Sequence, residues 1–200
     1  MLIKLKRSDC FDQYPKFPWS IEYRNKHFFP ETYNRYVLTL PSKTVKSYAK
    51  ELAVALLSLM QSMGYEKLVF LGDSTVAWLH QQNDYKPVRE AVAYLTGNKV
   101  SKTFNGGLIV NTDEIGEFAK HLFWLVRCNA AFPNVHAMDE GEHIIISLCK
   151  YGNIHFYTLD EATDNLLKEQ LPSVELYFLN TGTCYERFGK KRHIAHRETV

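Results

Sequence analysis

An amphipathic helix followed at once by a short apolar strand is the feature that most constrains the fold of this chain. Apolar residues recur with helical spacing over residues 45–63, where Ser42 or Thr44 can cap the start and Gly64 suits the end. Residues 67–71 then read KLVFL, an apolar run of strand length. Because both elements must bury apolar surface, the sequence predicts helices packed on a sheet.

The other hydrophobic patterns extend this sheet and its helical layer. Residues 2–5 predict a first strand, and residues 143–149 and 154–158 predict a hairpin. Further strands are predicted at 36–40, 102–110 and 174–179, and further helices at 84–97, at 113–128 and between the capping box at Thr158 and Pro172. We therefore expect a single α/β or α+β domain over residues 1–200, with a mixed, partly antiparallel sheet flanked by helices.

Residues 11–36 stand apart because they fit neither the helical nor the strand period. This segment holds nine aromatic residues and three prolines, so we expect an irregular arm with at most a short helical turn near Pro30. Its rings either pack across the body or form a surface for a partner. For partner binding, the candidate residues are Trp19, Tyr23, Phe28 and Phe29.

Charge is distributed unevenly along the chain. The formal net charge is +2, but residues 187–197 contain five basic residues and no acidic one. The rest of the chain then holds 19 basic and 22 acidic residues. We interpret residues 187–200 as a basic tail, and nucleic-acid phosphates are a possible partner for it. The candidate contacts are Arg187, Lys190, Lys191 and Arg192.

The composition also indicates a compartment. The longest strongly apolar run, residues 53–60, is much shorter than the about 18 residues of a membrane span. Residues 1–7 lack the apolar core of an export signal. Four cysteines occur without a Cys-x-x-Cys pair, which favours reduced thiols. We expect a cytoplasmic protein that does not act at a membrane.

A glycine turn carrying a serine follows the strand at residues 67–71. We expect residues 76–79 to begin a helix, which would place Ser74 where backbone N–H groups can stabilise an oxyanion. The block Val69–Ser74 resembles the first block of the GDSL or SGNH serine hydrolases, and this resemblance implies that Ser74 is a nucleophile. The later Gly-x-Asn-Asp and Asp-x-x-His blocks of that family do not occur here. The alternative is that Asp73 or Ser74 caps the helix.

Histidines and acids supply the other candidate groups. For a hydrolase, the base would be His136, His143 or His155, oriented by Asp73 or Asp139. Residues 134–143 contain two histidines and three acids without a metal-binding spacing, so we interpret them as a solvated acidic loop. No metal site and no cofactor is predicted.

These observations leave three functions open. The leading hypothesis is a non-enzymatic protein that binds another protein, as an accessory, inhibitor or immunity-type protein, through the aromatic arm. The first alternative is a small serine hydrolase that uses Ser74, Asp73 and His143. The second alternative is nucleic-acid binding through the basic tail.

Overall fold

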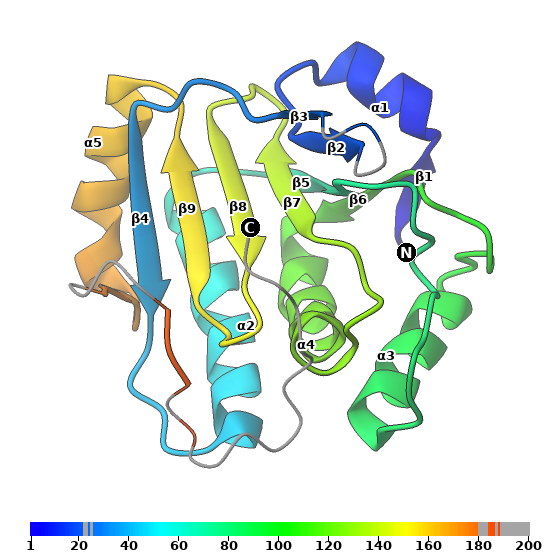
Figure 1. Ribbon diagram of the computed structural model, residues 1–200. Coiled ribbons are helices and arrows are strands. Elements are labelled where there is room, and N and C mark those ends of the chain that lie inside the picture. The colour runs from blue at the N-terminus through cyan, green and yellow to red at the C-terminus, as the bar shows by residue number, and fades with distance from the viewer. Residues whose placement is uncertain (22–23, 25, 180–183, 187, 189–200) are drawn as a thin grey trace.

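The computed structural model describes residues 1–21, 24, 26–179, 184–186 and 188. Within these residues, eight strands form one sheet in the order β1-β6-β5-β7-β8-β9-β4-β10, and every pairing in it is antiparallel (Figure 1). The strands are β1 (Ile3–Leu5), β4 (Asn34–Thr39), β5 (Lys67–Gly72), β6 (Gly107–Asn111), β7 (Val135–Asp139), β8 (Ile144–Leu148), β9 (Ile154–Thr158) and β10 (Tyr177–Phe178). The predicted combination of a sheet with flanking helices is confirmed in its α+β form, and the sheet that was expected to be mixed has only antiparallel pairings among the described strands.

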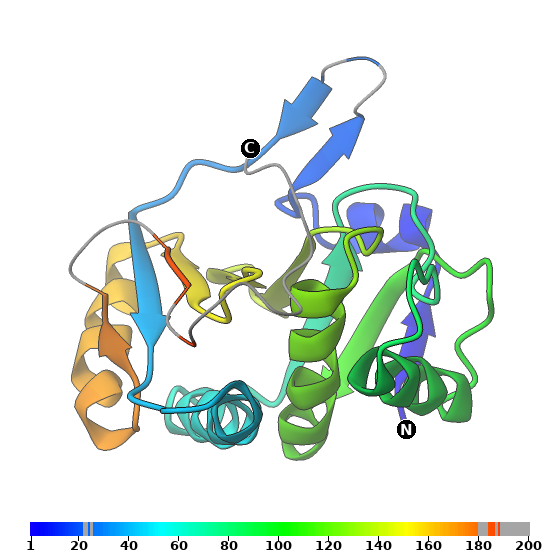
Figure 2. The ribbon, with the colours of Figure 1, turned by 60° about the horizontal axis from the view of Figure 1, so that its bottom comes forward.

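Helices cover the two faces of the sheet unequally (Figure 2). One face carries α2 (Val45–Ser62), α4 (Thr112–Cys128) and α5 (Glu161–Gln170), and α3 (Lys86–Gly97) packs beside α4. The opposite face carries only α1 (Arg7–Gln13) among the described helices. None of the described helices combines the length and apolar character needed to cross a bilayer.

The ends of α2 follow the chemistry that its sequence predicts. The Thr44 hydroxyl accepts a hydrogen bond from the backbone N–H of Ser47 at 3.1 Å, and Gly64 adopts a φ of +77° after the helix. The cap of α5 differs from the expected capping box. Asp160, rather than Thr158, caps this helix by accepting a hydrogen bond from the N–H of Thr163 at 2.7 Å.

Strand alternation divides the apolar side chains between two cores. Leu68 and Phe70 of β5 face the main core under the helices, whereas Val69 and Leu71 face a smaller core on the other side. The buried members of this smaller core are Cys10, Tyr14, Phe17, Val69, Leu71, Met138 and Ile145. The N-terminal segment therefore contributes to the fold by covering part of the second face.

The expectation of an irregular arm over residues 11–36 was wrong for much of that segment. Helix α1 enters it, and β2 (Trp19–Ile21) pairs with β3 (Lys26–Phe28) in a separate two-stranded hairpin. The three prolines did not prevent this because they lie between the elements and not inside them. Figure 2 shows this blue hairpin standing out from the body of the molecule.

Residues 134–143 do not form the expected acidic loop, because β7 occupies Val135–Asp139 near the middle of the sheet. The side chain of Asp139 is nearly fully buried and accepts hydrogen bonds from the N–H groups of Gly141, His143 and Ile144. A carboxylate with this many donors is a stable part of a turn between strands. Because His136 and Asp139 are polar, the sequence pattern favoured a loop over a strand, although the other three residues of β7 are apolar.

The helix expected at residues 76–79 is also absent, since residues 73–85 are described throughout and contain no helix. Trp78 is 1% exposed, and its ring nitrogen donates to the carbonyl oxygen of Gly106 at 2.8 Å. The backbone N–H of Trp78 donates to Phe104 O instead of to a helical partner. The tertiary contacts of Trp78, and not the local helical pattern, therefore determine the backbone conformation of this segment.

Candidate functional site

The strand register separates the residues proposed for a serine hydrolase. Gly72 pairs with Val135 and Leu68 pairs with Asp139, so Ser74 and Asp139 lie at opposite ends of the β5–β7 pair. At about 3.3 Å per strand residue, the two ends are more than about 10 Å apart. The His143 ring bonds to Asp139 at 2.8 Å and is held at the far end. The predicted grouping of Ser74 with His143 was therefore wrong.

Asp73 and Ser74 occupy a turn without a helix behind it. The Asp73 carboxylate accepts a hydrogen bond from the Asn134 amide at 3.1 Å, and its backbone oxygen accepts one from Ser20 N at 2.8 Å. No hydrogen bond joins the Ser74 hydroxyl to a histidine in the part of the chain that the structure describes. Asp73 ties the base of the β2–β3 hairpin to the sheet.

The predicted binding residues fall into three groups. Trp19, Phe28 and Phe29 lie on or directly after the β2–β3 hairpin, with Trp19 stacked on Phe28 at a centroid distance of 6.2 Å. Tyr23 lies outside the described residues. The four basic candidates Arg187, Lys190, Lys191 and Arg192 of the tail also lie outside them.

Aromatic and basic side chains gather where the hairpin leads into β4, and we call this region the hairpin surface. Phe28, Phe29 and Tyr33 are 36%, 39% and 49% exposed. An open hollow of about 510 Å³ lies beside Phe29. The lining residues are Phe29, Pro30, Glu31, Thr32, Arg35 and Tyr157. This is a concave, partly apolar surface that lies beside the projecting hairpin, a combination that suits recognition.

The hairpin surface continues along the second face of the sheet. Phe29 packs on Tyr157 and on His136, at centroid distances of 4.8 and 5.9 Å. His136, Ser147 and His155 are register partners on three adjacent strands, so their side chains share this face. Burial, with a smaller effect from His155, lowers the pKa of His136 to about 4. His136 is therefore neutral at pH 7.

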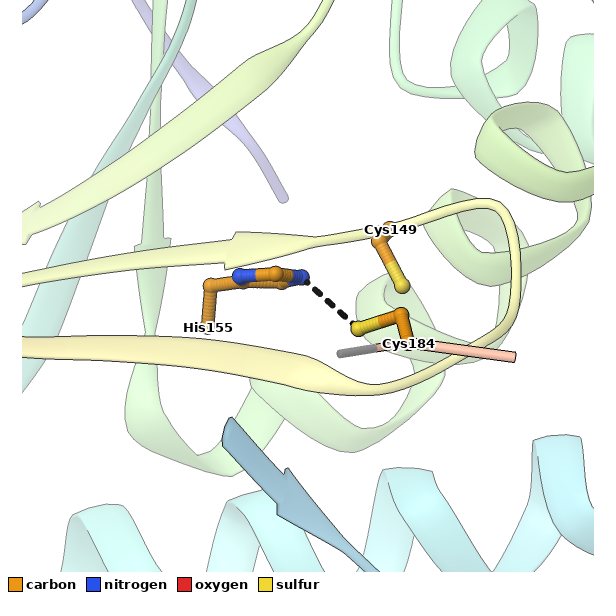
Figure 3. A group of neighbouring side chains, drawn as sticks. All are labelled: Cys149, His155 and Cys184. Atoms are coloured by element: carbon orange, nitrogen blue, oxygen red, sulfur yellow. Dashed lines mark hydrogen bonds between the residues drawn. The ribbon is translucent and has the colours of Figure 1, made fainter. Parts of the chain in front are cut away.

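Two cysteine side chains lie beside His155. Cys149 follows β8, His155 lies on β9, and Cys184 belongs to the C-terminal segment (Figure 3). His155 Nε2 and Cys184 Sγ are 3.3 Å apart, and the three ligand-type atoms all lie within 4.8 Å of one another. We call Cys149, His155 and Cys184 the thiol–imidazole cluster. All three residues are partly buried.

The turn between β8 and β9 positions two members of the cluster. Gly152 in this turn has a φ of +90°, and a side chain there would meet the rings of Phe123 and Tyr48. The Tyr48 hydroxyl donates to Gly152 O at 3.0 Å, which fixes the turn from the helical side. Only glycine fits this position, so the turn that brings Cys149 near His155 is closely specified.

Arg127 holds the third member in place. Its guanidinium is nearly fully buried, donates to Lys150 O at 3.0 Å and pairs with Glu186 at 2.8 Å. Phe188 lies over the same guanidinium at 5.4 Å. The Arg127 side chain therefore joins the turn between β8 and β9 to the C-terminal segment. Cys184 lies in this segment, two positions before Glu186.

Interactions within the cluster shift the pKa values of its two thiols in opposite directions. Hydrogen bonding with Cys149, and then with His155 and Asn153, lowers the pKa of Cys184 well below its usual range. The same bond to Cys184, together with burial, raises the pKa of Cys149. A thiolate beside an imidazole can act as a metal ligand or as a nucleophile.

Thiol alkylation is expected to distinguish Cys184 from the other cysteines. Because hydrogen bonds lower its pKa well below the usual range, we expect Cys184 to react as a thiolate at neutral pH, and its alkylation rate should change little between about pH 7 and about pH 9. An ordinary thiol would react faster as the pH rises. Iodoacetamide labelling followed by peptide mass spectrometry measures the rate at each site.

Cys10 and Cys128 provide the internal controls for this labelling. Burial raises the pKa of each thiol to about 12, so both should stay unlabelled in the folded protein. A Cys184 rate that rose about tenfold per pH unit would contradict the thiolate assignment.

Sequence reasoning missed the cluster. Cys149 was expected to end the strand predicted at residues 143–149, but it lies just beyond the end of β8 and is partly exposed. The available signal was the spacing of Cys149 and His155 around Lys150–Asn153, which a hairpin brings together. Cys184 carried no comparable signal, because it is distant from Cys149 and His155 in the sequence and only the tertiary fold brings it beside them.

Comparisons with known proteins give no further guide to this site. No protein-family model, no curated protein and no solved structure matches the chain.

Proposed function

We propose that this protein acts by binding another protein through the hairpin surface, as a non-enzymatic accessory, inhibitor or immunity-type protein. The proposal rests on the observation that some aromatic residues of the segment 11–36 are buried in the core whereas others are exposed. Tyr14 and Phe17 are buried in the second core, whereas Phe28, Phe29 and Tyr33 remain exposed on or after a projecting hairpin. Exposed aromatic residues in one place are typical of surfaces that bind proteins.

Charge indicates the chemistry of the partner. The basic residues Arg24 and Lys26 of the hairpin and Arg35 of β4 are exposed, and Glu31 is the exposed acid among the described residues between the hairpin and β4. Outside residues 187–197, the chain has more acidic than basic residues. A locally basic, aromatic surface favours a protein partner with an apolar patch rimmed by acidic side chains.

The cytoplasm is the proposed site of action. Cys10 and Cys128 pack as small apolar residues in the interior, and none of Cys10, Cys128, Cys149 and Cys184 forms a disulfide. Cysteines without disulfides are characteristic of proteins in reducing compartments.

A photo-crosslinking amino acid at position 28 tests the proposal in the organism that makes the protein. Position 54 is the matched control, because Val54 is a 63% exposed apolar residue on the helical side. We expect a protein partner to be crosslinked from position 28 and not from position 54. Equal crosslinking from both positions, no crosslinking, or crosslinking only to nucleic acid or to a second copy would contradict the proposal.

Affinity for the purified partner should then depend on the hairpin surface. Phe28→Ser and the charge reversal Lys26→Glu are each expected to weaken binding at least about tenfold, and Val54→Ser to leave it unchanged. Calorimetry measures the affinity, and circular dichroism checks that each variant is folded. A folded Phe28→Ser variant that binds as tightly as the parent would refute the role of the hairpin.

A further inference from the structure

We propose that Cys149, His155 and Cys184 form a binding site for one zinc ion. This inference is independent of the proposed binding of a protein partner. It rests on three side chains from separate parts of the chain that place two sulfurs and one imidazole nitrogen together (Figure 3). Two thiolates and an imidazole form a donor set that zinc prefers.

The donor atoms lie close to the spacing that tetrahedral coordination requires. With a Zn–S bond of about 2.3 Å and a Zn–N bond of about 2.0 Å, two tetrahedral ligands lie about 3.5 to 3.8 Å apart. The observed separation of His155 Nε2 and Cys184 Sγ is 3.3 Å, and all three atoms lie within 4.8 Å. Rotations that move the sulfurs by about 1 Å are therefore enough to hold the ion.

The surroundings are suited to thiolate ligands. Backbone N–H groups of Tyr151 and Asn153 donate toward the sulfur of Cys149, and the buried Asn153 amide lies beside Cys184. Donors of this kind stabilise negative sulfur and orient it. A zinc ion with two thiolates and a neutral imidazole has no net charge, which reduces the cost of a partly buried position.

The fold positions the ligands before any ion binds. Gly152 and Tyr48 fix the turn that carries Cys149 and His155, and Arg127 with Glu186 fixes the segment that carries Cys184. Three protein ligands leave the fourth tetrahedral position to water or to a small external ligand. The ion would join the C-terminal segment to the β8–β9 hairpin.

Cobalt(II) is the probe for the first test, because thiolate ligation gives it a charge-transfer absorption that free cobalt lacks. The reduced full-length protein carries His193→Gln and His196→Gln, so that these two tail histidines cannot bind the probe. We expect one equivalent of cobalt to produce this absorption, and one equivalent of zinc to abolish it. No such absorption, or a cobalt spectrum without sulfur ligands, would overturn the proposal.

Variants then assign the ligands. Cys149→Ala, His155→Gln and Cys184→Ala are each expected to weaken zinc binding at least about 100-fold, whereas the matched control Cys128→Ala should bind as the parent does. Parental affinity in any of the three folded ligand variants would overturn the site.

X-ray absorption of the zinc-loaded parent gives a second measurement that does not depend on how the variants fold. Two sulfur neighbours at about 2.3 Å and a nitrogen neighbour at about 2.0 Å are expected. A coordination sphere of oxygen and nitrogen alone would overturn the assignment. So would a Cys149–Cys184 disulfide that persists under reducing conditions and prevents binding.

Discussion

Trp78→Ala is expected to lower the free energy of unfolding by about 4 kcal/mol, a large share of the stability of a domain of this size. The Trp78 side chain is 1% exposed and lies against the rings of Phe118 and Phe132. Its ring nitrogen donates to Gly106 O at 2.8 Å, so the substitution removes apolar burial and also leaves a buried carbonyl without its donor. Urea unfolding at 25 °C measures the effect.

Two further variants separate the contributions of this residue. Trp78→Phe keeps much of the ring but loses the N–H donor, and we expect a loss of about 2 kcal/mol. Trp124→Ala is the matched control, because Trp124 is only partly buried at the surface of α4, and we expect less than half the effect of Trp78→Ala. Equal effects at Trp78 and Trp124 would contradict the anchoring role of Trp78.

The contacts of Trp78 also explain why the helix predicted at residues 76–79 does not form. Residues 76–79 are apolar and follow a turn, which favours a helix start, but four residues supply little intrinsic helical stability. The burial of one indole ring against α4 and the Gly106 carbonyl outweighs that preference. A contact between residues 28 positions apart is not visible in a local pattern.

Long periodic segments were predicted well because many residues carry the same signal. The helices α2 and α4 each repeat their apolar face over four turns or more, and the β8–β9 hairpin combines apolar runs with a glycine turn. Strand β7 has only five residues, and polar side chains occupy two of them, so composition pointed to a loop.

The candidate sites were predictable to different degrees. Composition identified the aromatic arm, but it could not show that Phe17 is fully buried while Phe29 is 39% exposed. The thiol–imidazole cluster depends on Cys184, which is 35 positions from Cys149 in the sequence and reaches it only through the path of the C-terminal segment. Hydrophobic periodicity carries no information on such a path.

Asp164→Ala is the second substitution with a large expected effect, a loss of about 3 kcal/mol at pH 7. The Asp164 side chain is 1% exposed and joins α5 to the sheet by accepting hydrogen bonds from Tyr36 Oη at 2.7 Å and Thr158 Oγ1 at 3.1 Å. It also pairs with Lys168 at 2.7 Å. Thermal unfolding followed by circular dichroism measures the loss, and Tyr36→Phe, which removes one donor, should cost about 1 kcal/mol.

The pH dependence of this effect has a definite sign. Burial alone would raise the pKa of Asp164, but hydrogen bonds from Lys168 and Tyr36 lower it below the unfolded value of 3.8. The carboxylate therefore stabilises the folded state fully above about pH 4, and this contribution is lost as the pH falls through the folded pKa. Asp164→Asn, which cannot ionise, should differ most from the parent near pH 7 and least near pH 2. A difference that stays constant over this range would contradict the assignment of the stabilising charge to Asp164.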